Sequence, residues 1–172
     1  MGFPIPLNSL KKPLNYAEIA KERLRRASKK INEQSSESEA DLGFKVLKLS
    51  NSNFKQWQQI KGKDKEALAK QIELFIDPVS ENATTENMVY ELLLKSGKDL
   101  NSKLEHKENY YCVNGNELIL MLEKATQEIV DAVIKEKPQK VIALDRLFKD
   151  NDQLKTNTSL QMKDAGIEFK TI

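Results

Sequence analysis

The chain has 172 residues, of which 39% are hydrophobic and 31% are charged, and its formal net charge is +2. This length suits one domain, or one domain with an appended segment, and is sufficient to bury a real core. A single cysteine, Cys112, excludes an internal disulfide and fits a reducing cytoplasm, and with one histidine, His106, it leaves almost no ligands for structural zinc. No apolar run approaches the roughly 20 residues of a membrane helix, and the first residues lack a signal-peptide pattern. We therefore expect a cytoplasmic globular protein without a metal site or a membrane contact.

The positive charge is concentrated at the start of the chain. Residues 1–31 hold eight Lys and Arg side chains against Glu18 and Glu22, whereas the remainder holds 20 basic and 24 acidic residues. Any electrostatic contact with nucleic acid must therefore rest on the first segment.

Residues 16–31 predict a basic helix. Asn15, with Glu18 three residues later, resembles a capping box, and apolar residues recur at helical spacing. This thin apolar stripe consists of Ala20, Leu24, Ala27 and Ile31. Arg23, Arg26 and Lys30 fall along one side of this helix, with Arg25 and Lys29 close by. They can neutralise successive phosphates, but they equally fit a solvated face or a face that docks on an acidic partner, and these alternatives stay open.

The middle of the chain predicts a loop over 32–42, a strand over 42–50, and a turn with a short helical segment over 51–60. Phe54 and Trp57 of this last stretch are expected to face the core. Two helices are predicted next, over 64–76 and 84–97. The first places Leu68, Ile72 and Phe75 on one face, and the second ends at Gly97. The side chains expected to be buried in the second helix are Met88, Val89, Leu92 and Leu93.

The remaining third predicts a mixed α/β arrangement. Three β-like runs, 102–108, 109–115 and 116–123, suggest a small antiparallel meander with one turn at Asn-Gly-Asn. The third run begins a strand–helix–strand–helix–strand unit that ends at residue 172, which indicates parallel strands flanked by helices. The later segments of this unit are 126–137 (helix), 139–146 (strand), 151–166 (helix) and 167–172 (strand). The fold class predicted is therefore α/β with some α+β character: a basic N-terminal helix, then helices packed on a mixed sheet.

The stretch NDQLKTN (151–157) is the densest polar cluster near a strand end, which is where ligands bind in open α/β sheets. Asp150 with Gln153, or Asp152 alone, can cap the following helix, and this explanation is favoured. Lys155 and Asn157 are candidates for a polar contact with DNA. Carboxylates and a lysine at a strand end can also handle phosphate or metal, which leaves a small enzyme site around Asp145, Asp152 and Lys155 as a minor alternative. The chain has no glycine-rich phosphate loop and no catalytic triad to support it.

Four stretches in order resemble the C-terminal region of type III restriction–modification methyltransferase (Mod) subunits. They are AEIAKERLRRASKKI, DLGFKVLKLSNSNFKQW, DRLFKDNDQLKTN and MKDAGIEFKTI. This resemblance covers nearly the whole chain. It implies that residues 1–31 are the remnant edge of a methyltransferase domain, residues 32–42 a linker and residues 43–172 a C-terminal α/β domain.

The resemblance also implies a function for the longer parent protein. Such subunits transfer a methyl group from S-adenosylmethionine to adenine in DNA, act as dimers and supply sequence recognition to a separate restriction (Res) subunit. Their Asp-Pro-Pro-Tyr and Phe-x-Gly-x-Gly motifs do not occur here: Asp77–Pro78 stands alone, and Ile5 replaces the glutamate of the family's Leu-Pro-Glu-Pro. We therefore expect a C-terminal fragment or truncated product without cofactor or catalytic residues. Its expected role is subunit assembly, DNA-backbone contact or both, and the alternative is an interaction module that does not touch DNA.

Overall fold

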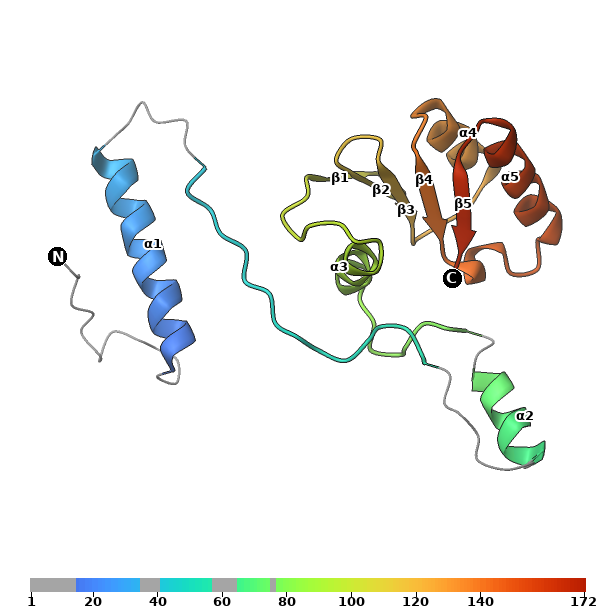
Figure 1. The fold of residues 1–172 in the computed structure, drawn as a ribbon, viewed down its shortest axis with the longest axis horizontal. Coiled ribbons are helices and arrows are strands. Elements are labelled where there is room, and N and C mark those ends of the chain that lie inside the picture. Colours follow the sequence, from blue (N-terminus) through green and yellow to red (C-terminus); the bar gives the residue numbers. More distant parts are fainter. Residues whose placement is uncertain (1–14, 35–40, 57–64, 75–76) are drawn as a thin grey trace. The chain divides into compact units, whose positions relative to one another are not determined.

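The computed structural model describes residues 15–34, 41–56, 65–74 and 77–172 (Figure 1). They belong to two compact units, residues 1–49 and residues 50–172. Within the described residues, the first unit has the helix α1 (Tyr16–Gln34), and the second has a sheet and the other helices. The elements of the second unit are α2 (Lys65–Leu74), α3 (Thr85–Lys95), β1 (Leu104–Lys107), β2 (Tyr110–Val113), β3 (Leu118–Met121), α4 (Gln127–Lys135), β4 (Lys140–Ala143), the 3-10 turn η2 (Asp145–Phe148), α5 (Asp152–Asp164) and β5 (Glu168–Thr171).

Five strands form one mixed sheet in the order β1-β2-β3-β4-β5. β1, β2 and β3 pair antiparallel, and β4 and β5 then add in parallel. In the turn between β2 and β3, Asn114 and Gly115 have φ angles of 49° and 72°, a left-handed conformation that these two residue types accept most readily. The predicted meander, the parallel unit and the α/β class are confirmed.

The two faces of the sheet are covered by different helices. Right-handed crossovers that step along the sheet in one direction leave both connecting helices on the same face, and α4 and α5 accordingly lie side by side (Figure 1). Their buried side chains, among them Val130, Val133 and Met162, pack on Ile119 and Val141. Helix α3 packs on the opposite face. The core on that side joins Met88, Val89, Leu92 and Leu93 to Val113, Leu118, Leu120 and Ile142.

Helix α3 matches its prediction closely. The four side chains expected to be buried are all 2% exposed or less. Thr84 caps the helix by accepting a hydrogen bond from the backbone N–H of Asn87 (3.3 Å). Gly97 has a φ of 67°, and the N–H of Lys98 donates to the carbonyl of Leu93 (2.9 Å), which ends the helix in the way that glycine permits.

The prediction of a strand over 42–50 is wrong. Residues 41–50 have no regular secondary structure. The alternating apolar pattern is present, but a strand also needs a neighbouring strand to receive its backbone groups, and none of the described strands pairs with this segment. Residues 51–56 are not helical either, because Phe54 makes an isolated antiparallel bridge with Val79. Phe54 faces the core as predicted (8% exposed), whereas Trp57 lies outside the described residues.

The two predicted N-terminal helices are confirmed, and their described side chains are little buried. Helix α1 begins one residue after Asn15, whose side chain accepts a hydrogen bond from the N–H of Glu18 (2.9 Å). It extends three residues past the predicted end and none of its residues is buried. In α2 the side chains of Leu68 and Ile72 are exposed, and Phe75 lies outside the described residues.

Adjacent leucines on α3 provide a test of this packing. Leu93 is 0% exposed and Leu94 is 59% exposed. We expect Leu93→Ala to lower the free energy of unfolding by about 2–5 kcal/mol, because it leaves a cavity in the core. Leu94→Ala is the matched control and should change it by less than about 0.5 kcal/mol. Urea unfolding followed by circular dichroism measures both, and equal losses in the two variants would contradict the arrangement of α3.

Candidate functional site

The basic face of α1 is the first candidate site. Arg23 and Arg25 are exposed, and within the described part of the chain neither guanidinium has an ion-pair or hydrogen-bond partner. Lys30 is also exposed one turn further along. An exposed guanidinium presents several N–H donors in a planar fork, which suits it to phosphate or carboxylate oxygens. Arg23 and Lys30 lie on the same side of the helix and can meet an anionic surface together, whereas Arg25, two residues after Arg23, projects from nearly the opposite side.

Other cations of α1 are held within the helix. Arg26 Nε donates to Glu22 Oε1 (2.8 Å), and Lys21 Nζ donates to Glu18 Oε1 (2.6 Å). Such pairs at i,i+4 and i,i+3 stabilise a helix by only a few tenths of a kcal/mol, roughly 0.2–0.5 each. They nevertheless offset part of the basic charge of α1, because each of these two cations has a carboxylate of the same helix beside it. Arg26, one of the predicted contact residues on α1, thus already has a carboxylate beside it.

The stretch 151–157 resolves into local structural roles. Asn151, and neither Asp150 nor Asp152, is the N-cap of α5, since its side chain accepts from the N–H of Leu154 (3.0 Å). Asp150 instead takes a left-handed conformation with a φ of 62°. Lys155 Nζ forms an ion pair with Asp145 Oδ1 at 2.5 Å, and Asn157 is exposed. The capping explanation is thus correct in kind, although the predicted capping residue was wrong.

The minor alternative of an enzyme site gains little from this geometry. Asp145 and Lys155 are brought together as an ion pair, which joins the start of η2 to the second turn of α5. Asp152 is exposed at the first turn of α5. Among the described residues, no group of three or more His, Cys, Asp or Glu side chains is placed to hold a metal ion. Asp77 likewise serves structure, because its carboxylate accepts from the N–H of Val79 (3.0 Å) and lies 3.5 Å from Arg146 Nη1.

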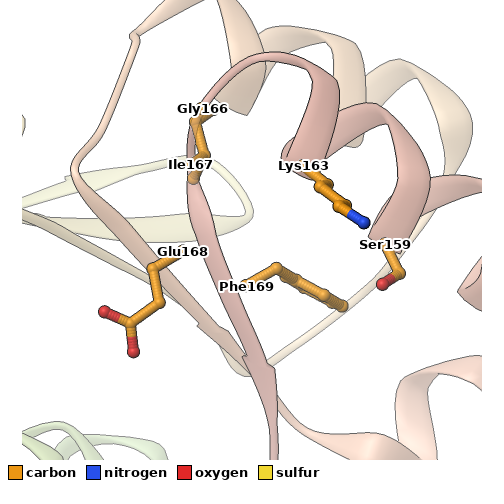
Figure 2. Close-up of a pocket in the computed structure, with 6 residues that line it drawn as sticks. All are labelled: Ser159, Lys163, Gly166, Ile167, Glu168 and Phe169. Carbon is orange, nitrogen blue, oxygen red and sulfur yellow. The ribbon is translucent and has the colours of Figure 1, made fainter.

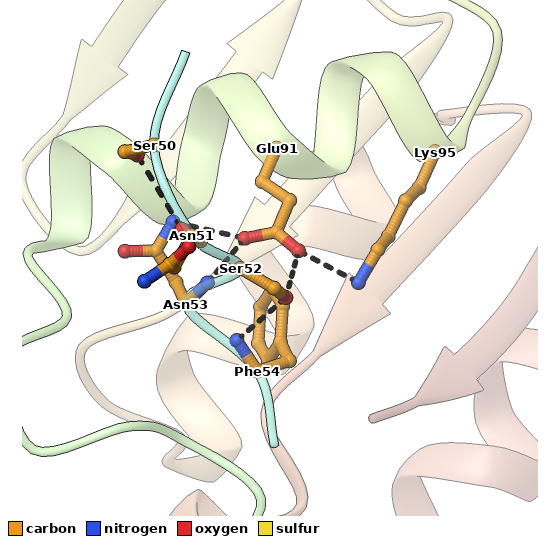
Figure 3. A network of polar contacts seen from close by, with 7 residues as sticks. All are labelled: Ser50, Asn51, Ser52, Asn53, Phe54, Glu91 and Lys95. Carbon is orange, nitrogen blue, oxygen red and sulfur yellow. Dashed lines mark hydrogen bonds and ion pairs between the residues drawn. The ribbon is translucent and has the colours of Figure 1, made fainter. Parts of the chain in front are cut away.

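A polar clamp, absent from the sequence prediction, holds the start of the second unit on α3 (Figure 3). Its centre is the Glu91 carboxylate. It accepts from Ser52 Oγ (2.5 Å), from the backbone N–H of Asn53 (2.6 Å) and from the Asn53 side-chain amide (2.9 Å). Lys95 Nζ lies 2.8 Å from Glu91 and 4.6 Å from the ring centroid of Phe54. The polar run SNSN at 50–53 was the available signal, but only a tertiary contact identifies Glu91 as its partner.

The clamp shifts the titration of Glu91. Burial by itself raises the pKa of this carboxyl group. Hydrogen bonds from Lys95, Ser52 and Asn53 together lower the pKa by more than burial raises it, so the pKa falls from 4.5 to about 2. The carboxylate therefore stays ionised at neutral pH and to well below pH 4.5. This arrangement stabilises the fold. A carboxylate that already accepts several hydrogen bonds and has a low pKa is poorly suited to act as a general acid or base.

One open pocket lies between β5 and α5 (Figure 2). Phe169 points toward the α5 side, where Ser159 and Lys163 lie, while Glu168 points away from it. The pocket has a volume of about 340 Å³. Lys163 and Ser159 supply an ammonium and a hydroxyl to this lining, whereas its carboxylate, Glu168, pairs with Lys140 (2.6 Å).

His106 and Cys112, the single histidine and cysteine, make local contacts within the sheet. The His106 ring stacks on Tyr111 with centroids 4.3 Å apart, and His106 Nε2 lies 3.5 Å from Glu123 Oε1. Tyr111 also donates its hydroxyl to Glu123 (3.0 Å). Cys112 is buried, and burial raises the pKa of its thiol, which disfavours the reactive thiolate.

The predicted contact residues fall into the two separate units. Arg23, Arg25 and Lys30 share α1, whereas Lys155 and Asn157 belong to α5. Comparison of the chain with models of protein families, with curated proteins and with solved structures gave no match. No helix in the described ranges is long and apolar enough to cross a membrane. Ile5 and its neighbours lie outside those ranges.

Replacing Glu91 tests the clamp. Because the folded-state pKa is below the ordinary value, ionised Glu91 stabilises the fold fully above about pH 4.5, and this contribution is lost as the pH falls toward 2. We expect Glu91→Gln to lower the free energy of unfolding at pH 7 by about 1–2 kcal/mol, after allowance for solvent screening. The deficit should shrink as the pH is lowered from 5 to 2, as measured by urea unfolding at several pH values.

The exposed Glu81 supplies the matched control, since Glu81→Gln removes the same charge from an exposed turn of the same unit. Its unfolding free energy should stay close to that of the wild type at every pH. If the Glu91→Gln deficit proved independent of pH, the ionised carboxylate would not be the stabilising element.

Proposed function

We propose that the chain is the non-catalytic C-terminal domain of an adenine-specific DNA methyltransferase of a type III restriction–modification system. It acts in the cytoplasm, in subunit assembly and in contact with the DNA backbone. The observation that supports this proposal is the exposed cationic side of α1, which carries Arg23 and Lys30, with Arg25 exposed elsewhere on the same helix. The ordered resemblance of four sequence stretches to such subunits supports the family.

The electrostatics of α1 favour phosphate contact over base recognition. Charged side chains on an exposed helix face neutralise phosphates without reading sequence, and the resulting affinity falls steeply with salt. The domain would therefore add non-specific affinity to a complex whose target site is read elsewhere. Lys155 is engaged by Asp145 and contributes less, whereas the exposed Asn157 can donate to a backbone oxygen.

The catalytic chemistry is assigned to the longer parent protein. There S-adenosylmethionine is the methyl donor, and the parent works as a homodimer together with a restriction subunit. This chain lacks the catalytic Asp-Pro-Pro-Tyr motif and the cofactor motif. Well-placed side chains elsewhere cannot replace a cofactor cradle.

A second candidate function is a protein-interaction module without DNA contact. It is favoured by the ion pairs that engage part of the basic charge of α1, namely Arg26 with Glu22 and Lys21 with Glu18. In this case the basic face would meet an acidic protein surface. DNA titration separates the two candidates.

We expect the chain to bind a labelled DNA duplex in fluorescence anisotropy, with an affinity that falls as salt is raised. Arg23→Ala combined with Arg25→Ala removes the two unpartnered guanidinium groups. If both contact phosphates, the slope of log affinity against log salt should decrease in magnitude by about 1.8, since each contact contributes about 0.9.

Lys135→Ala combined with Lys137→Ala is the matched control, because it removes two exposed charges from the end of α4 instead. The control should leave the salt slope of the wild type unchanged. Equal losses in both pairs would indicate a general charge effect, and no binding even at low salt would favour the interaction module.

The isolated chain should also transfer no methyl group. Incubated with radiolabelled S-adenosylmethionine and an adenine-containing duplex, it should leave the DNA unlabelled and should show no shift in melting temperature with the cofactor. Labelled adenine in that experiment would contradict the non-catalytic assignment.

A further inference from the structure

Helix α1 has an exposed apolar side in addition to its basic side. Its stripe recurs at intervals of four, three and four residues, which keeps it in line along the helix. It consists of Ala20, Leu24, Ala27 and Ile31. Leu24 and Ile31, the large members, are 51% and 42% exposed, and no residue of the helix is buried. The helix is therefore amphipathic, and within the described residues its apolar side is left largely in solvent.

A second apolar segment is attached to the same helix. The Ser28 hydroxyl donates to the carbonyl oxygen of Leu42 (2.9 Å), which ties the extended segment 41–49 to α1 (Figure 1). In this segment Phe44 and Val46 are 39% and 52% exposed. An exposed apolar surface of this kind, bordered by charge, is typical of a protein interaction site.

The charges beside the stripe indicate what covers it. The positions that flank an apolar seam set the choice of partner helix. On α1 these positions hold Arg23 and Lys30 on one side and, on the other, Lys21, whose ammonium is paired with Glu18 (2.6 Å). A second copy would bring only cations and neutral groups to the same border, so a partner with carboxylates fits better.

We propose that α1 lays the stripe of Ala20, Leu24, Ala27 and Ile31 into an apolar groove of a second protein whose rim carries Asp or Glu side chains. This is the helix-in-groove mode of recognition, in which residues at i, i+4, i+7 and i+11 anchor the helix. The small alanines permit close approach, and the two larger residues supply the anchors. The inference goes beyond the proposed function, because it concerns the apolar side of α1 and holds whether or not the basic side contacts DNA.

The test uses the full chain and two synthetic helical peptides with the same apolar seam. One peptide carries Glu at every flanking position and the other carries Lys. Fluorescence anisotropy of the labelled peptides should show binding to the Glu peptide and at least tenfold weaker binding to the Lys peptide. Leu24→Asn should weaken binding of the Glu peptide at least tenfold.

Leu160→Asn is the matched control, since Leu160 is 54% exposed on α5. It should leave peptide binding unchanged, and circular dichroism should show that both variants retain their helices. Duplex titration of the Leu24→Asn chain reports separately on the proposed function, because Arg23 and Arg25 remain in place.

Three results would overturn the inference. The first is equal binding of both peptides, or no binding of the Glu peptide. The second is a dimer of the chain in analytical ultracentrifugation that Leu24→Asn dissociates, which would assign the stripe to a second copy. The third is binding to phosphatidylserine vesicles that requires Leu24, which would assign it to a lipid surface.

Discussion

The parallel pairing of β3 with β4 is the interaction on which the second unit depends. All four residues of β3 are buried, because α3 covers one face of this strand and α4 the other. β3 is also the last strand of the antiparallel meander and the first of the parallel unit. Without this pairing the meander would be a small sheet with an open apolar edge, and α4 and α5 would have no surface to cover.

The clamp at Glu91 marks where the chain becomes part of that core. Residues 52–54 are held on α3 by charge-assisted hydrogen bonds to Glu91 and by the bridge of Phe54 to Val79. The exposed fraction of the apolar side chains changes sharply over five residues, from 96% at Leu49 to 8% at Phe54. Polar groups thus decide the boundary between the packed unit and the segment that precedes it.

The charged side chains of the two units are engaged to different extents. Arg23 and Arg25, which have no partner among the described residues, lie on α1, while many lysines of the second unit pair locally with carboxylates, as Lys98 does with Glu117 and Lys140 with Glu168. A helix with one basic and one apolar side can meet two different partners at once. The two proposals for α1, contact with the DNA backbone and docking on a second protein, are therefore compatible.

The sequence by itself determined most of the elements of this protein, because local signals define them: Thr84 and Gly97 bound α3, Asn114 and Gly115 make the meander turn, and apolar spacing separates strands from helices. It also determined the basic character of α1. The tertiary structure alone decided that residues 42–50 are not a strand, that Asn151 caps α5, and that Glu91 and Lys155 are engaged within the fold. These outcomes depend on which groups meet across tens of residues, and neither the period nor the composition of a local stretch contains that information.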